Sequence, residues 1–135
     1  MRRLKLASLI LMSLFYVFAG YNHFANPAFY LRMMPPYIPF HDAMVFLSGV
    51  AEVALGVALL IPRLRVYAAW GVIALLIAVF PANLYMATAN LTLGNAPSWA
   101  LWARLPFQLV FIAWAWWHTR DGSTAQSASA RTAAA

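Results

Sequence analysis

Six polar side chains interrupt strongly apolar stretches of the chain and carry the chemistry of a ligand-binding site. Two pairs among them are spaced four residues apart, so each pair shares one face of a helix. An ionised side chain near the middle of a membrane costs about 2.5 to 10 kcal/mol, so it should face the protein interior and find a partner there. We therefore expect the six to converge; they are His23, Ser48, Glu52, Asn83, Arg104 and Gln108.

Pairing of Glu52 with Arg104 is the simplest way to neutralise both side chains. The alternative is a protonated Glu52 hydrogen-bonded to Asn83 or Ser48, since burial disfavours the charged form of a carboxylate. Two interpretations of the polar residues stay open. Either they line a pocket that opens outward, or they only hold the helices together, as interhelical hydrogen bonds do in membrane bundles.

Two prolines favour the pocket. A proline inside a helix removes one backbone hydrogen bond and bends the helix. Pro81 should free the carbonyl of Ile77, and Pro106 that of Trp102, so both bends fall close to the polar residues. Small residues that permit close helix approach are Gly49, Gly56 and Gly71.

Other common chemistries find no support in the sequence. The chain has no cysteine, which excludes disulfides, thiol catalysis and thiolate metal sites. No Gly-rich phosphate loop and no Ser/His/Asp arrangement is present. His23, His41, Met33 and Met34 are potential copper ligands, but their spacing matches no fixed metal pattern, so we expect no metal site. His118 is expected to be structural, at a helix end where the dipole favours a cation.

The composition is that of an integral membrane protein. Of 135 residues, 64% are hydrophobic and only 9% are charged, which leaves too little polar surface to enclose a water-soluble core. Each apolar segment is long enough for the roughly 30 Å hydrocarbon layer. We predict an all-α, four-helix membrane bundle in one domain, residues 1–120, followed by a disordered cytoplasmic tail. The expected helices cover about residues 4–24, 43–61, 66–89 and 99–118, and the tail covers 121–135.

The basic residues predict the orientation of the bundle. Seven lie at one end and two, Arg32 and Arg104, at the other, so both termini should face the cytoplasm. The net charge of +6 thus reflects topology and not a nucleic-acid partner. The Pro- and aromatic-rich stretch from His23 to His41 then becomes a long outer loop, which we expect to cover the polar layer as a lid. Its lid residues are Met33, Met34, Pro35, Pro36, Tyr37 and His41.

Short motifs recur along residues 15–118: Ala19-Gly20, His23-Phe24, Pro27, Tyr30, Met33-Met-Pro-Pro-Tyr37, Pro39, His41, Ser48-Gly-Val, Glu52, Gly56, Pro62-Arg63, Phe80-Pro-Ala-Asn83, Met86 and Arg104-Leu-Pro-Phe-Gln108. In this combination the chain resembles the DoxX-like family of small bacterial four-helix membrane proteins. The resemblance implies a location in the bacterial cytoplasmic (inner) membrane and an association with quinones and membrane redox complexes. Thiol-relay chemistry is not implied here, because the chain lacks the cysteines it needs.

Two hypotheses from different classes follow. In the first, the outward-facing pocket binds a small quinone- or lipid-like molecule; Arg104 and Asn83 hold its oxygens, and Glu52 exchanges a proton. In the second, the protein is a noncatalytic membrane subunit that docks a partner through residues 27–39. The expected partners are the lipid bilayer and a membrane or extracytoplasmic redox protein, and whether the chain is an enzyme stays open.

Overall fold

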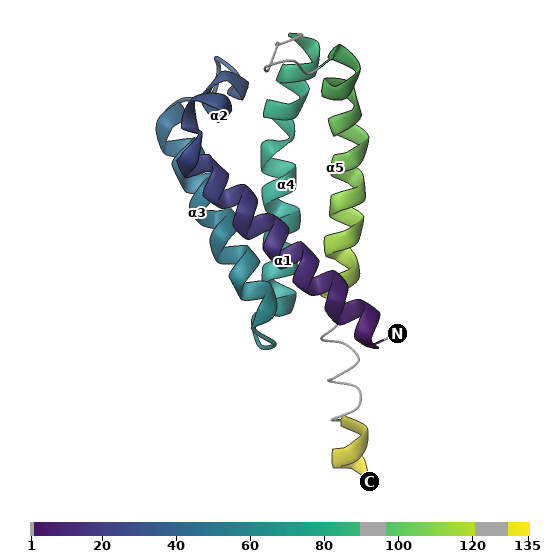
Figure 1. Cartoon of the computed structure of the whole chain (residues 1–135). Helices are drawn as coiled ribbons and strands as arrows, with labels where there is room; N and C mark the ends of the chain where they lie inside the picture. The colour runs from purple at the N-terminus through teal and green to yellow at the C-terminus, as the bar shows by residue number, and fades with distance from the viewer. Residues whose placement is uncertain (1, 90–96, 121–129) are drawn as a thin grey trace.

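The computed structural model of the chain describes residues 2–89, 97–120 and 130–135, and the prediction of an all-helical fold is confirmed. No strand occurs in these ranges. Four long helices carry the structure and a fifth, short one connects the first two of them (Figure 1). The helices are α1 (Arg2–Ala25), α2 (Pro27–Met33), α3 (His41–Leu60), α4 (Arg65–Thr88) and α5 (Ser98–Thr119).

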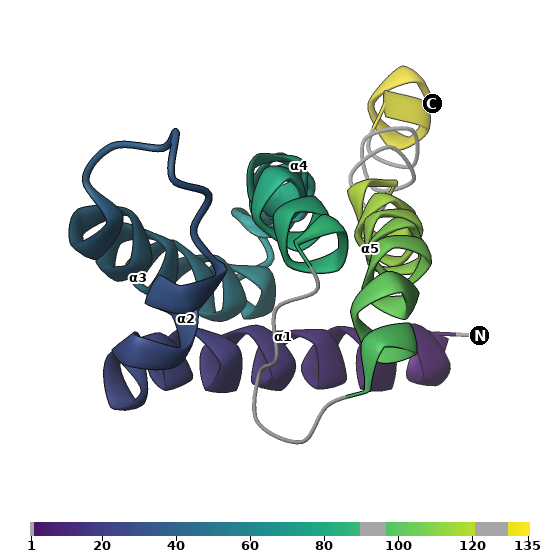
Figure 2. The ribbon, with the colours of Figure 1, turned by 90° about the horizontal axis from the view of Figure 1, so that it is seen from above.

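The long helices associate as two pairs. Helix α1 packs along α3, α4 packs along α5, and α3 and α4 join the pairs. Seen along the bundle, α1 runs obliquely beneath α3, α4 and α5 (Figure 2). The start of α1, the connection between α3 and α4 and the end of α5 lie at one end of the bundle, and α2 lies at the other (Figure 1). The six basic residues at the first of these ends are Arg2, Arg3, Lys5, Arg63, Arg65 and Arg120.

Glycines bring α1 and α3 into close contact. A Cβ atom added at Gly20 would lie 2.7 Å from the carbonyl oxygen of Gly49, and one added at Gly56 would lie 3.0 Å from the Ser13 carbonyl oxygen. The Ser13 hydroxyl donates a hydrogen bond of 2.6 Å to the Gly56 carbonyl across the same contact. Backbones can approach this closely only where side chains are absent, which is how small residues stabilise helix pairs in membranes.

Much of the large apolar surface faces outward. Phe18 is 70% exposed and Leu11 is 61% exposed, and both lie in the apolar part of α1. Helices α1, α3 and α4 are long and apolar enough to cross a membrane, judged by length and composition. This supports the membrane prediction for three helices. Helix α5, in which Arg104, Gln108 and several tryptophans lower the hydropathy, is not among them.

The stretch from His23 to His41 is not the continuous loop that we predicted. Helix α1 continues to Ala25, and α2 begins at Pro27, in the first helical turn where the missing N–H of proline costs nothing. The irregular part is therefore short, residues 34–40, and ends at Phe40, whose φ of 55° is left-handed. The sequence already contained the start signal for α2 in Asn26-Pro27, but the surrounding prolines suggested a loop throughout.

Two predictions concern residues that are partly or wholly outside the described ranges. The sequence predicts a turn at residues 90–98, where Gly94 and Asn95 lie, and residues 90–96 of it are outside the described ranges, as is the predicted tail from residue 121 to residue 129. Residues 130–134 at the end of that tail are helical and exposed.

Candidate functional site

A cavity of about 320 Å³ lies between the α1/α3 pair and the α4/α5 pair; we call it the central cavity. All four long helices line it with residues three or four positions apart, which places each set on one helix face. The six polar residues singled out in the sequence all line it. Its wall includes Tyr16, Ala19 and His23 of α1, Val45, Ser48 and Glu52 of α3, Leu76, Val79, Ala82 and Asn83 of α4, and Arg104, Phe107, Gln108 and Phe111 of α5.

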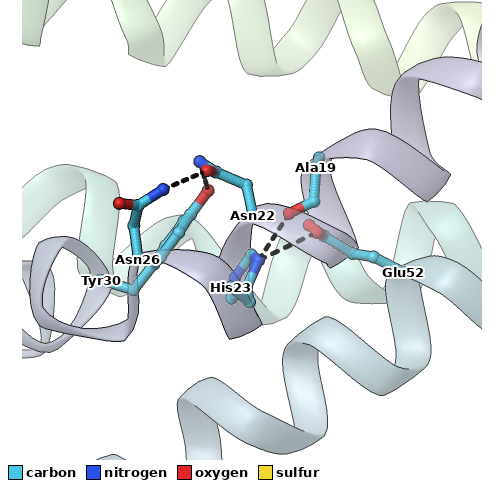
Figure 3. Close-up of polar contacts among 6 residues, drawn as sticks. All are labelled: Ala19, Asn22, His23, Asn26, Tyr30 and Glu52. Atoms are coloured by element: carbon cyan, nitrogen blue, oxygen red, sulfur yellow. Dashed lines mark hydrogen bonds and ion pairs between the residues drawn. The ribbon is translucent and has the colours of Figure 1, made fainter.

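Glu52 faces His23, and not Arg104 as we predicted (Figure 3). Its Oε2 atom lies 3.3 Å from the His23 Nδ1 atom. Within the described residues, no ion pair joins Glu52 to Arg104. The geometry of the helices explains the difference, because the glycine contact holds the backbone of α3 against α1, whereas Arg104 belongs to α5 on the opposite side of the central cavity.

The His23 ring is fixed by two further contacts. Its Nδ1 atom lies 2.9 Å from the Ala19 carbonyl oxygen, and since a carbonyl only accepts, Nδ1 must carry the hydrogen. The ring also stacks on Tyr30 of α2, with centroids 3.7 Å apart. The Nδ1 hydrogen is bonded to the Ala19 carbonyl oxygen. The Glu52 Oε2 atom is therefore buried without a hydrogen-bond partner among the described residues.

Helix α2 is attached to α1 by side-chain amides. The Asn22 side-chain amide donates to the Tyr30 hydroxyl at 2.9 Å, and the Asn26 side-chain amide donates to the Asn22 side-chain oxygen at 2.7 Å (Figure 3). Burial raises the pKa of Tyr30 above its ordinary value, so this hydroxyl stays neutral. These bonds hold the Tyr30 ring against His23 at the edge of the central cavity.

Asn83 and Gln108 are engaged with each other across α4 and α5. The Asn83 amide donates to the Gln108 side-chain oxygen at 2.8 Å, and the Gln108 amide donates to the Leu76 carbonyl. The carbonyl that Gln108 uses is thus one residue before the one that Pro81 was expected to free. Glu52 forms no hydrogen bond to Asn83 or to Ser48 within the described residues, so the alternative partners for its carboxyl are not seen either.

Arg104 lines the central cavity, and most of its N–H donors have no partner among the described residues. Its side chain is exposed, and its hydrogen bond within the described residues runs from Nη1 to the Met86 sulfur, at 3.7 Å. A thioether is a weak acceptor, whereas guanidinium offers five N–H donors. The guanidinium can therefore bind an oxygen-bearing group at the mouth of the central cavity.

The six residues predicted as a lid divide into two groups. Met33 and Met34 line the central cavity, Pro35 is buried, and His41 Nε2 lies 3.0 Å from the Pro35 carbonyl oxygen. Pro36 and Tyr37 are exposed, Tyr37 by 73%. A smaller cavity of about 270 Å³ lies beneath α2 and shares His23 and Val45 with the central cavity. His23 and His41 each contact a backbone carbonyl oxygen.

Aromatic residues of the wall escaped the sequence analysis. Tyr16 is only 2% exposed, and its hydroxyl has no hydrogen-bond partner among the described residues. Phe15 stacks on Phe111 with ring centroids 5.1 Å apart, across α1 and α5. The spacing of Tyr16, Ala19 and His23 indicates that Tyr16 lies on the same helix face as His23. Tyrosine is common in apolar membrane helices, so its polar hydroxyl did not stand out.

A second polar cluster joins α1 to α5 at the opposite end of the bundle. The Trp114 indole donates to the Ser8 hydroxyl at 2.7 Å, and Ser8 lies 3.2 Å from His118 Nε2. His118 is fully buried. We predicted a structural role for this histidine from the helix dipole alone. The contact with Ser8 was not predicted.

The comparison with known proteins yields one family. The model of a domain of unknown function, DUF8561, matches residues 12–119. No curated protein and no solved structure matches the chain. The resemblance to the DoxX-like family is therefore wrong. Its motifs combine small residues, helix prolines and interfacial aromatics, which the physics of membrane helices favours in unrelated families as well.

Proposed function

This chain belongs to the DUF8561 family, a domain of unknown function, and we propose that its central cavity binds a small amphipathic molecule of the quinone-like or lipid-like kind. The observation that carries the proposal is a cavity of about 320 Å³ to which four helices contribute polar groups within an otherwise apolar and aromatic wall. Binding sites for small molecules are apolar concavities of this size with a few converging polar groups.

The hydrogen bonding within the wall argues for binding over helix association alone. Polar groups that only hold helices together satisfy one another, as Asn83 and Gln108 do. Tyr16 and Glu52 differ, since each has a buried oxygen without a hydrogen-bond partner in the described chain. Buried polar atoms of this kind cost roughly 1 to 3 kcal/mol, so their presence at a cavity calls for an explanation such as a ligand.

The proposed setting is the bacterial cytoplasmic (inner) membrane, with α5 as the fourth span and both termini in the cytoplasm. The concentration of basic residues at the end that holds the start of α1 and the end of α5 supports this orientation. The central cavity then opens toward the outer side, beneath α2. The alternative of a docking loop has less support, because Met33, Met34 and Pro35 turn inward.

The test fills the cavity. Ala82 lines the central cavity, and Ala78, one turn away on α4, is exposed. In lipid nanodiscs formed directly from native membrane, mass spectrometry should find a small molecule enriched with the wild-type protein over nanodiscs lacking it. We expect Ala82→Phe to remove this enrichment and Ala78→Phe to keep it. Equal enrichment in both variants, or none with the wild type, would refute the proposal.

A further inference from the structure

We propose that the ligand of the central cavity is polar at two ends, with a hydroxyl that donates to the Glu52 carboxyl and an oxygen acceptor, such as a carboxylate or phosphate, held by Arg104. This inference rests on the proposed function and specifies the chemistry of the molecule bound there. An apolar, ring-containing or chain-like middle would lie between the two polar ends.

Glu52 needs a hydrogen-bond donor that the described chain does not supply. No lysine or arginine of the described ranges lies within ion-pair distance of it. Its nearest polar neighbour, His23, has its Nδ1 hydrogen on the Ala19 carbonyl. Oε2 itself is buried, but the Glu52 side chain is 15% exposed and lines the central cavity, so a rotation of this side chain would present its carboxyl to a donor there. A ligand hydroxyl matches this site whether the carboxyl is charged or neutral, since both forms accept a hydrogen bond.

Arg104 needs the opposite partner, an acceptor. The Met86 sulfur is its only hydrogen-bond acceptor within the described residues, at 3.7 Å. A guanidinium binds carboxylate and phosphate through paired N–H groups, and this geometry makes it selective for oxygen anions. The exposed position of Arg104 leaves its guanidinium accessible to the anionic end of a ligand while the rest enters the cavity.

Asn83 and Gln108 are already engaged within the wall, unlike Glu52 and Arg104. Asn83 donates to Gln108, and Gln108 donates to Leu76, so one of the two N–H donors of each amide and the Gln108 side-chain oxygen are used. This narrows our sequence-based hypothesis, in which Asn83 also held ligand oxygens. Phe15, Phe107 and Phe111 also line the central cavity and offer apolar surface to the middle of the ligand.

The test uses three probes with the same ring system: a naphthalene with a hydroxyl at one end and a carboxylate at the other (hydroxynaphthoate), its methyl ether (methoxynaphthoate), and naphthol, which lacks the carboxylate. Affinities are measured by equilibrium dialysis against the full-length protein in nanodiscs, with empty nanodiscs subtracted. Hydroxynaphthoate should bind about tenfold more tightly than methoxynaphthoate, as expected for one hydrogen bond to a buried acceptor.

Variants then separate the two ends. Glu52→Leu should abolish the preference for the hydroxyl over the methyl ether, and Glu52→Gln should reduce it, whereas Asp42→Asn on the same helix should keep it. Arg104→Gln should weaken hydroxynaphthoate about tenfold and leave naphthol unchanged, as expected for loss of a charge-assisted bond. Arg32→Gln is its control, because Arg32 is also exposed on the outer side but does not line the central cavity.

The outcomes distinguish this inference from the function on which it rests. If all probes bind, Ala82→Phe blocks them, and the hydroxyl and methyl ether bind equally, the cavity binds ligands but the two-ended chemistry is wrong. The same holds if the Glu52 variants keep the hydroxyl preference, or if Arg104→Gln weakens naphthol as much as hydroxynaphthoate. If no probe binds above empty nanodiscs and no native molecule is enriched, both proposals fail.

Discussion

Two hydroxyls of α1, three residues apart, occupy contrasting environments. Ser13 donates a hydrogen bond of 2.6 Å to the Gly56 carbonyl, whereas the Tyr16 hydroxyl is buried without a partner in the described chain. A hydrogen bond inside a membrane protein contributes roughly 0.5 to 1 kcal/mol, but a buried hydroxyl without one carries a desolvation cost. The same kind of atom therefore has opposite effects on stability at the two positions.

We predict opposite results when each hydroxyl is removed. Ser13→Ala should lower the free energy of unfolding by roughly 0.5 to 1 kcal/mol, and Tyr16→Phe should leave it unchanged or raise it in ligand-free protein. Unfolding of both variants in the same mixed micelles, followed by circular dichroism, measures the difference. A loss at Tyr16 equal to that at Ser13 would show that the tyrosine hydroxyl has a partner and would weaken the case for a ligand there.

At the residue scale, the sequence predicts which side chains meet better than how they pair. The six polar residues stand out because such residues are rare in apolar helices, and all six line the central cavity. Their pairing depends on helix rotation and on the closeness of α1 and α3, which the sequence does not state. The predicted partner of Glu52 was therefore wrong. Tyr16 was missed because a tyrosine differs little in polarity from the residues of its helix.

At the scale of helices, the position of His23 depends on a glycine. A Cβ atom at Gly49 would lie 2.8 Å from the Cβ atom of His23 and 3.1 Å from the Gly20 carbonyl oxygen, so α1 would have to move away from α3. A Cβ atom at Gly71 would meet only the end of the Leu55 side chain, which can change rotamer. The α1/α3 contact at Gly49 thus has no room for a side chain, whereas the α3/α4 contact at Gly71 can accommodate one.

We predict that Gly49→Ala destabilises the protein by more than about 1 kcal/mol and lowers ligand binding, because it shifts the α1 wall of the cavity. Gly71→Ala should be nearly neutral, since the gain in helix propensity offsets the local repacking. Unfolding in mixed micelles and retention of the copurifying molecule report the two effects. Similar losses in both variants would mean that the α1 and α3 contact is not the critical one.

The elements themselves were more predictable than their connections. Long apolar runs between turn signals identify membrane helices because backbone groups in lipid must be hydrogen-bonded within the segment. Helix α2 was missed because a helix of seven residues, beside a proline-rich stretch, has too few turns for a periodic pattern to emerge. Its function of holding Tyr30 against His23 depends on tertiary contacts that no local pattern encodes.

At the scale of the whole molecule, orientation can be measured directly because the chain contains no cysteine. We predict that Tyr37→Cys reacts with a membrane-impermeant thiol reagent in intact spheroplasts. Arg63→Cys, at the opposite end of the bundle, should react only after the membrane is permeabilised. Both side chains are exposed in the wild type, so access by reagent is not limited by burial. The reverse pattern would invert the proposed topology and place the mouth of the central cavity in the cytoplasm.

The cluster of Ser8, Trp114 and His118 bears on how the protein is made. Ser8 and His118 are 110 positions apart, whereas Ser13 and Gly56, which join α1 to α3, are only 43 apart. During synthesis, α1 and α3 can associate early, but Ser8 can meet Trp114 and His118 only after α5 leaves the ribosome. The α5 side of the central cavity is therefore added after the first helix pair can form, and a chain truncated before Arg104 should retain that pair but lack the α5 wall of the cavity.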